Sequence, residues 1–213
     1  MNSQNRTELL KDWVSEKIKK DFLFLIASSD ASFRRYFRIK TTDDSYIVMD
    51  APPQKESIKS FLEIDQILSK NEVNVPDIYA NDMTLGFILM QDFGSTTYSD
   101  VLDGDNQENL YSDAINSLIK IQKNVNRDLS QIYSKKVLID EMTLFIDWYL
   151  KKYKEYNLNK KEYAELLYWF EEIAKNVLNQ QKVFVHRDYH SRNLMKVKIN
   201  NPGIIDFQDA LEG

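Results

Sequence analysis

The chain has 213 residues and contains no cysteine. Disulfides and thiolate metal sites are therefore excluded, and the composition is compatible with a reducing compartment. The sequence also lacks an apolar run long enough to cross a bilayer and a signal-peptide core at its N-terminus. Its net charge is −5, so the composition gives no sign of a basic surface that would bind nucleic acid or an anionic membrane. We therefore expect a cytoplasmic protein that binds neither.

Histidine is also scarce, and both histidines lie in one segment, residues 186–193, which reads HRDYHSRN. The segment IIDFQ follows at 204–208. This HRDxxxxN pattern with a later acid is typical of kinase-type phosphotransferases. In that chemistry Asp188 orients the attacking hydroxyl and takes its proton, while Asn193 and Asp206 bind Mg²⁺ at the ATP phosphates.

The residues around this motif favour two loop ends that meet. Residues 183–185 and 194–197 are apolar runs typical of strands, and 200–203 is a turn signal. A further strand at 204–205 would deliver Asp206. Oxygen ligands on two such loops suit Mg²⁺, which keeps several waters. The alternative is a polar loop with ordinary turn-forming acids.

The rest of the chain divides by pattern into two regions. With 43% hydrophobic and 29% charged residues, it can bury a sizeable core in one or two domains. The first region predicts helices and a mostly antiparallel sheet, the second mainly helices. The expected helices are 6–20, 55–70, 106–126, 138–156 and 160–179, and the expected strands are 36–39, 46–49, 75–79 and 85–91, with 22–27 a strand or a helix end.

This order of elements predicts an α+β, protein-kinase-like two-lobed fold. Residues 1–91 would form the nucleotide-binding N-lobe, with an antiparallel sheet and helices. Residues 92–95 would form the hinge, whose backbone groups pair with adenine. Residues 96–213 would form a mainly helical, incomplete C-lobe that carries the catalytic loop and the metal-binding acid.

The tripeptide Asp92-Phe93-Gly94 spells the DFG motif of protein kinases. It lies upstream of the HRD segment, whereas the metal-binding acid has to follow that segment. We therefore interpret it as a strand end and hinge. The alternative for Asp92 is a turn residue whose side chain caps the turn locally.

Glycine is missing from the stretch 28–36, where a kinase would have its GxGxxG phosphate loop. Backbone N–H groups and serine hydroxyls could still form an anion-binding nest there. Arg34 or Arg35 could reach the phosphates. The alternative is a polar hairpin turn with solvated arginines.

Lysine is missing from the third strand, because Asp50 stands where the VAIK lysine would be. Either another cation takes its place, with Lys40 and Arg38 as candidates, or the usual lysine–glutamate ion pair is not used. Glu56 and Glu63 are the possible helix partners.

Six segments of the chain form a recognisable set: SDASFRRYFR, IVMDAPP, VPDIYA, GFILMQDFG, HRDYHSRNLM and IIDFQDA. Together they resemble the aminoglycoside phosphotransferase-like family, and within it the bacterial anomeric N-acetylmuramate/N-acetylglucosamine kinases of cell-wall recycling. In this branch the missing glycines and strand lysine are normal. The resemblance implies ATP and Mg²⁺ as cofactors. It also implies transfer of the γ-phosphate to the C1 hydroxyl of an amino sugar.

The layout also gives the expected binding residues. A loop that holds Asp188 at the acceptor hydroxyl brings His190 and Arg192 close to it, although Arg192 could instead be a structural cation of the loop. The expected nucleotide-binding residues lie after the first strand, on the third strand and at the hinge: Ser32, Phe33, Arg34, Arg35, Val48, Met90, Gln91, Asp92 and Phe93.

The resemblance further implies that relatives continue beyond Gly213 with helices that complete the C-lobe and help to enclose the acceptor. We expect a C-terminally truncated lobe to expose apolar surface and to bind the acceptor poorly. Two other functions stay open. One is a kinase of the same fold for choline, homoserine or an aminoglycoside. The other is a non-catalytic nucleotide-binding module, although such a module would not need the base Asp188.

Overall fold

The computed structural model describes residues 3–29, 33–125 and 131–213. The chain forms two compact units. Unit 1 comprises Met1–Ile121 and Asp188–Asp209, and unit 2 comprises Gln122–Arg187 and Ala210–Gly213. The boundaries of these units differ from those of the expected lobes, 1–91 and 96–213. The division into two lobes joined by a hinge at 92–95 remains a prediction.

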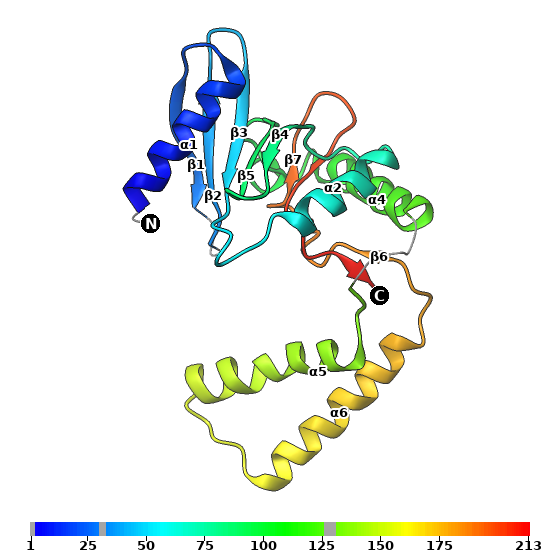
Figure 1. Cartoon of the computed structure of the whole chain (residues 1–213). Helices are drawn as coiled ribbons and strands as arrows, with labels where there is room; N and C mark the ends of the chain where they lie inside the picture. Colours follow the sequence, from blue (N-terminus) through cyan, green and yellow to red (C-terminus); the bar gives the residue numbers. More distant parts are fainter. Residues whose placement is uncertain (1–2, 30–32, 126–130) are drawn as a thin grey trace. The chain divides into compact units, whose positions relative to one another are not determined.

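Unit 1 contains a five-stranded antiparallel sheet in the order β1-β2-β3-β5-β4. The sheet is preceded by one helix and followed by others (Figure 1). The elements of unit 1 are α1 (Ser3–Ile18), β1 (Leu23–Ser29), β2 (Arg35–Lys40), β3 (Ser45–Asp50), α2 (Lys59–Lys70), β4 (Ile78–Asp82), β5 (Phe87–Gln91), α3 (Tyr98–Val101), the first part of α4 (Gln107–Asn124), β7 (Leu194–Met195) and β8 (Gly203–Ile204).

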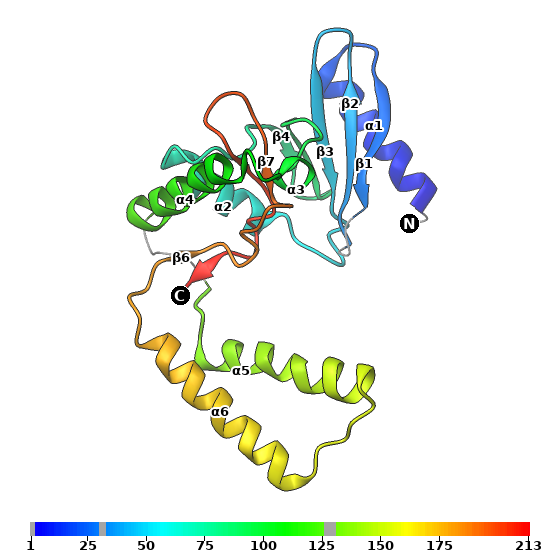
Figure 2. The same ribbon diagram turned by 180° about the vertical axis from the view of Figure 1, so that it is seen from behind.

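Helix α1 lies along one face of the strands β1–β3 (Figures 1 and 2). Its apolar residues recur at helical spacing, so one stripe faces the sheet. Leu10, Trp13 and Val14 are buried there against Phe37 and other sheet residues. Burying a side chain of this size contributes about 1.5–3 kcal/mol to the stability of the folded unit. The helix is therefore an integral layer of unit 1.

Side-chain alternation along β2 divides the sheet into two faces. Phe37 and Ile39 point into the core beneath α1, while Tyr36 and Arg38 line a cavity. Successive side chains of a strand point to opposite faces, so both sets come from one short segment. The core and the cavity therefore share this strand.

The acid at the expected lysine position is a structural anchor. Asp50 is fully buried and its Oδ1 accepts a hydrogen bond of 2.7 Å from Nε of Arg6 on α1. Its Oδ2 accepts one of 3.0 Å from Nε of Arg35, the residue opposite it on β2. Arg6 also donates to the carbonyl of Leu85 at 2.6 Å. These charge-assisted bonds tie α1 to the sheet.

Gly86 lets the chain pass close to the end of β3. Its φ is +72°, a left-handed conformation that favours glycine. A Cβ there would lie 1.9 Å from the carbonyl oxygen of Ala51. The Ala51 N–H donates to the Gly86 carbonyl at 2.9 Å. A side chain at residue 86 would therefore break the β3–β5 connection.

Unit 2 is mainly helical and includes a two-stranded pair, β6 with β9. Ser134 and Asn159 accept hydrogen bonds from the first turns of the two helices that follow them, so both helix starts are capped. Its elements are the end of α4, α5 (Lys135–Leu144), the π-helical segment η1 (Phe145–Tyr153), α6 (Lys160–Leu178), β6 (Phe184–Val185) and β9 (Leu211–Glu212).

The helices of unit 2 expose an aromatic surface. Tyr149 stacks between Phe145 and Tyr153, with ring centroids 5.3 and 5.6 Å apart. The exposed large side chains on these helices are Leu144, Phe145, Trp148, Tyr149, Tyr153, Tyr163, Tyr168, Trp169, Ile173 and Leu178. None of the helices in the described ranges is long and apolar enough to cross a membrane.

Most expected elements form, and the differences have local causes. The segment 22–27, which the pattern left open, is the strand β1. Helix α2 begins at Lys59 rather than at 55, because residues 55 and 56 donate to the carbonyl of Pro52 in a turn. Strand β4 begins after Pro76, which has no N–H for the ladder. The expected helix 138–156 is divided into α5 and η1.

Replacing Asp50 by alanine should strongly destabilise unit 1. The substitution leaves the guanidinium groups of Arg6 and Arg35 facing each other in a largely buried place, and breaking a buried ion pair costs about 3–5 kcal/mol. Urea unfolding monitored by tryptophan fluorescence measures the change in the free energy of unfolding. The control Asp43→Ala removes an exposed carboxylate and should cost less than about 1 kcal/mol. Equal effects of the two substitutions would contradict the anchoring role.

Candidate active site

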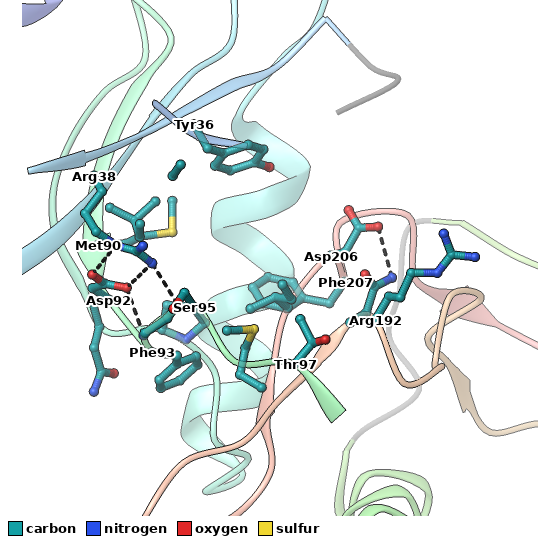
Figure 3. Close-up of a pocket in the computed structure, with 18 of the residues that line it drawn as sticks. Tyr36, Arg38, Met90, Asp92, Phe93, Ser95, Thr97, Arg192, Asp206 and Phe207 are labelled. Carbon is teal, nitrogen blue, oxygen red and sulfur yellow. Dashed lines mark hydrogen bonds and ion pairs between the residues drawn. The ribbon is translucent and has the colours of Figure 1, made fainter. Parts of the chain in front are cut away.

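A cavity of about 500 Å³ lies within unit 1 (Figure 3). One wall is the sheet face that carries Tyr36 and Arg38, and another is the segment Met90–Thr97 after β5. Residues on both sides of the β7–β8 hairpin, including Arg192 and Asp206, close the opposite end. The sequence predicted that these three regions would meet, and the structure brings them together.

The proposed metal ligands are in contact at this cavity. The amide Nδ2 of Asn193 lies 3.2 Å from Oδ2 of Asp206 and 3.0 Å from the backbone carbonyl of Asp188. The Ile205 N–H donates to the Asn193 carbonyl at 3.1 Å. These bonds join the catalytic loop to the loop that carries Asp206. The three residues identified from the HRD pattern therefore form one constellation.

The catalytic loop is a tight turn. The His190 N–H donates to the Asp188 carbonyl at 3.0 Å, and the Asn193 N–H donates to the His190 carbonyl at 2.9 Å. Arg187 and Asp206 have φ values of 73° and 62°, in the left-handed region that costs energy for most residues. Strain of this kind concentrates at functional sites.

The side chains of Asp188, His190 and Arg192, which were expected to face the acceptor, do not all lie at the cavity. The side chains of Asp188 and His190 are exposed and stand outside the cavity lining, whereas Arg192 lines it (Figure 3). Arg187, just before Asp188, pairs with Glu141 within unit 2. The roles of Asp188, His190 and Arg192 remain predictions.

The donor set of Asn193 and Asp206 fits Mg²⁺. Both side chains offer oxygen atoms, and Mg²⁺ binds through one or two carboxylates together with waters and substrate phosphates. Within the described ranges no group of three or more histidine or acidic residues could hold a metal ion. A mixed amide–carboxylate pair that shares its metal with a nucleotide does not require such a group.

Arg34 is the cation that lies beside Asp206. It is buried, pairs with Glu56 and has its Nη1 3.8 Å from Oδ1 of Asp206. Burial alone would lower the pKa of Arg34, but the charges of Tyr36 and Glu56 and hydrogen bonds with both raise it. The site therefore has a buried cation next to the proposed metal ligand.

The sequence pattern left Lys40 and Arg38 open as candidates for this cation, with Glu56 and Glu63 as its possible partners. Lys40 is exposed at the far end of β2. Arg38 pairs with Asp92 instead of with a helix glutamate. Glu63 forms a surface pair with Lys59. Of the two proposed acidic partners, only Glu56 meets a cation at the site.

Arg38 and Asp92 join the sheet to the hinge. Arg38 donates from Nε and Nη2 to the two carboxylate oxygens of Asp92, at 2.7 and 3.0 Å, and from Nη2 to the Gly94 carbonyl at 2.7 Å. Burial would raise the pKa of Asp92, but hydrogen bonds from Arg38, Ser45 and the Gly94 N–H hold it below its ordinary value. The Gly94 N–H bond is the local turn cap that was the alternative for Asp92.

The residues proposed for the hinge and the end of the strand before it, Met90, Gln91, Asp92 and Phe93, all line the cavity. The ring of Phe93 packs on Gly203 of β8, where a Cβ would come within 2.7 Å of it. The hinge is thereby held against the strand that leads to the metal-binding acid.

Three other expected nucleotide-binding residues lie elsewhere. Val48 is buried in the core beneath α1, and its neighbour Ile47 lines the cavity instead. Arg35 is engaged with Asp50, and Phe33 is exposed beneath the ammonium group of Lys55. Ser32 falls outside the described residues.

Several functional residues escaped the sequence analysis. Tyr36 and Ile47 line the cavity. Alternation against Phe37 and Ile39 on β2 indicates the face of Tyr36, whereas β3 is apolar on both faces and gives no such signal for Ile47. Phe207 packs on Phe61 of α2 with ring centroids 4.9 Å apart. Such a contact between distant segments has no signal in a single sequence.

A family model described as the phosphotransferase enzyme family matches residues 24–213. The chain belongs to the phosphotransferase enzyme family. Its catalytic-loop and metal-loop residues all lie within the matched region. Membership therefore covers the cavity and both of its loops.

Curated members of this family are similar to the chain. It is 43% identical to the N-acetylmuramate/N-acetylglucosamine kinase of Pseudomonas aeruginosa over 187 residues, which cover 88% of this chain and 55% of that protein. It is 34% identical to the Neisseria meningitidis protein of the same name over 210 residues, covering 96% and 62%. The chain thus spans little more than half the length of these relatives.

Solved structures of phosphotransferases share the fold. The choline kinase LicA from Streptococcus pneumoniae superposes with a TM-score of 0.70 at 14% identity, covering 98% of this chain and 70% of that chain. The ADP-bound aminoglycoside phosphotransferase APH(2'')-Ib gives 0.65 at 17% identity, covering 96% and 71%. The kinase-like two-lobed fold predicted from the sequence is confirmed.

A buried acid lies behind the hinge wall of the cavity. Asp65 of α2 is buried, and its Oδ1 has no hydrogen-bond partner among the described residues. Burial, with a smaller contribution from the charge of Asp77, raises the pKa of Asp65 to about 7. The carbonyl of Asp77 accepts a hydrogen bond of 2.8 Å from the N–H of Gln91, which lines the cavity.

Asp65→Asn should change how stability depends on pH. Because the folded-state pKa of Asp65 is raised, the folded protein binds this proton more tightly than the unfolded chain does. The native chain should therefore lose stability relative to the variant as the pH rises from about 4 to about 7. Melting temperatures measured across this range, with the exposed Asp12→Asn as control, test the prediction. A constant difference between native chain and variant would disprove it.

Proposed function

We propose that the chain carries the ATP- and Mg²⁺-dependent phosphotransfer site of a small-molecule kinase. The observation that supports this most is the contact between Asn193 and Asp206, joined to the backbone of Asp188 at the end of a cavity that the hinge also lines. Phosphoryl transfer depends mainly on positioning and on electrostatic stabilisation. The arrangement offers residues for both.

Each group has a proposed role in that reaction. Asp188 orients the acceptor hydroxyl and takes its proton, and Asn193 and Asp206 hold the metal against the nucleotide. When bound, Mg²⁺ would supply neutralisation of the phosphate charge at this site. Arg34, held by Glu56 beside Asp206, is placed to contact the phosphates.

The remaining surfaces would bind the two substrates. The backbone of Met90–Phe93 would pair with the adenine base, and Tyr36 and Ile47 would cover the opposite face of the base. Arg192 lines the cavity next to Asn193 and would face the acceptor. His190 would contribute from the exposed side of the loop.

We propose an amino sugar as the acceptor, phosphorylated at its anomeric hydroxyl in cell-wall recycling. The support is the similarity to relatives named N-acetylmuramate/N-acetylglucosamine kinase at 34–43% identity, together with the segments that resemble that branch. Solved neighbours with other acceptors in their names, such as choline kinase, are only 14% identical and support the fold alone.

Asp188→Asn should reduce the turnover of N-acetylmuramate and N-acetylglucosamine by about 10²–10⁴-fold, because a general base supplies that much. ATP affinity should stay unchanged, since Asp188 is exposed outside the cavity lining. Turnover is measured over a panel that adds choline and an aminoglycoside. The control Asp105→Asn changes an exposed acid in the loop before α4.

Two results would count against the proposal. Near-normal turnover of Asp188→Asn would remove Asp188 from its role. Phosphorylation of choline or the aminoglycoside in preference to both sugars would replace the proposed acceptor while leaving the phosphotransfer site in place.

Arg34→Met should weaken ATP binding by about 10–100-fold, because hydrogen bonds to charged groups contribute about 1.5–3 kcal/mol. Adenosine has no phosphates, so its affinity should be unchanged. The matched control is Lys40→Met, which removes an exposed cation from the same sheet. Isothermal titration calorimetry measures all affinities. A larger loss for Lys40→Met would show that the other candidate cation is the functional one.

A further inference from the structure

Gln208 holds the proposed metal-binding acid from behind. It follows Asp206 by two residues, is 94% buried and donates a hydrogen bond of 2.8 Å from Nε2 to Oδ1 of Asp206. Its own backbone carbonyl accepts a bond of 2.6 Å from Oγ of Ser60 on α2. One hydrogen bond therefore holds the backbone of Gln208 and another holds its amide group.

The surrounding charges determine which way the amide of Gln208 points. Nε2 faces Oδ1 of Asp206 and also lies 3.4 Å from Oδ2 of Asp209. A reversed amide would place its oxygen against two carboxylates, which offer no hydrogen for it. The N–H side must therefore face the acids, and Oε1 must point away from them.

This orientation leaves Oε1 in an unfavourable place. The atom is buried and has no hydrogen-bond donor in the part of the chain that the structure describes. A buried, unsatisfied carbonyl destabilises a fold, and such groups are few enough in native proteins that each needs an explanation. An apolar side chain of the same length would avoid this loss, so stability alone does not explain the glutamine.

The two oxygens of Asp206 have different neighbours. Oδ1 receives the Nε2 hydrogen bond of Gln208 and has Nη1 of Arg34 at 3.8 Å. Oδ2 faces the amide of Asn193, the second proposed metal ligand. Because Oδ1 is held on one side, the carboxylate cannot rotate freely, and Oδ2 stays with Asn193. In the DFG motif a glycine occupies this third position and has no side chain to do this.

We propose that Gln208 is a positioning residue for magnesium-dependent nucleotide binding. Its amide fixes the rotation of the Asp206 carboxylate so that Oδ2 and Asn193 are presented together, at a cost in stability from the unsatisfied Oε1. This inference rests on the proposed function. Removing groups that orient metal ligands typically weakens metal binding about 10–100-fold.

Gln208→Met tests this because it moves two measurements in opposite directions. Methionine keeps the length of the side chain and removes both the N–H donor and the buried oxygen. Thermal stability without ligand should be unchanged or higher, because an unsatisfied polar group is lost. The affinity for ATP in the presence of Mg²⁺ should fall about 10–100-fold, while the affinity without Mg²⁺ stays the same. Calorimetry with ATP, with and without Mg²⁺, measures both affinities on the full chain.

Two further variants keep the test decisive. Gln66→Met makes the same substitution at an exposed position of α2 and should change neither measurement. Gln208→Glu keeps the shape but places a third carboxylate beside Asp206 and Asp209. It should lose stability and also the Mg²⁺-dependent gain in affinity. If Gln208→Met failed to fold, glutamine would be required for packing and the inference would be overturned.

The outcomes separate the inference from the proposed function. If the native chain bound ATP equally well with and without Mg²⁺, the proposed function would fail. If the native chain showed the Mg²⁺-dependent gain and Gln208→Met retained all of it, only the role of Gln208 would fail.

Discussion

The buried carboxylate of Asp50 sets the arrangement on which the rest of unit 1 depends. It stands on the third strand, where other kinases carry a lysine, and it binds Arg6 of α1 and Arg35 of β2. Because neighbouring residues of an extended chain point to opposite faces, holding Arg35 on the α1 side directs Arg34 to the cavity side. There Arg34 meets Glu56 and lies near Asp206. The Asp50 carboxylate therefore accounts for both the anchored helix and the direction of Arg34 toward the cavity.

From Arg34 the contacts continue through α2 to the metal loop. Glu56 precedes α2, Phe61 of that helix packs on Phe207, and Ser60 holds the backbone of Gln208. A displacement of α2 would therefore disturb Arg34 and Asp206 together. This arrangement also explains why a glutamine can stand where the DFG motif has glycine, since α2 fixes its backbone while its amide fixes the acid.

Local patterns were sufficient for most elements, and they indicated that the segments carrying Asn193 and Asp206 meet. Helical spacing identified α1, and apolar runs with turn signals located the strands around the catalytic loop. They did not locate Val48 correctly, because a strand with apolar residues on both faces carries no internal mark of which face meets α1. Similarly, local patterns left Lys40 and Arg38 open as candidates for the cation that replaces the strand lysine, and they gave no sign that Asp92, 54 residues away, binds Arg38.

By itself, the sequence determined the family and the fold class, because these depend on motifs whose residues lie close together in the chain. The tertiary structure alone decided which arginine lies beside Asp206 and which oxygen of that acid Gln208 holds. It also decided that Asp65 is a buried acid with a raised pKa. These outcomes depend on pairing across many residues and on exclusion of water, neither of which is encoded in local spacing.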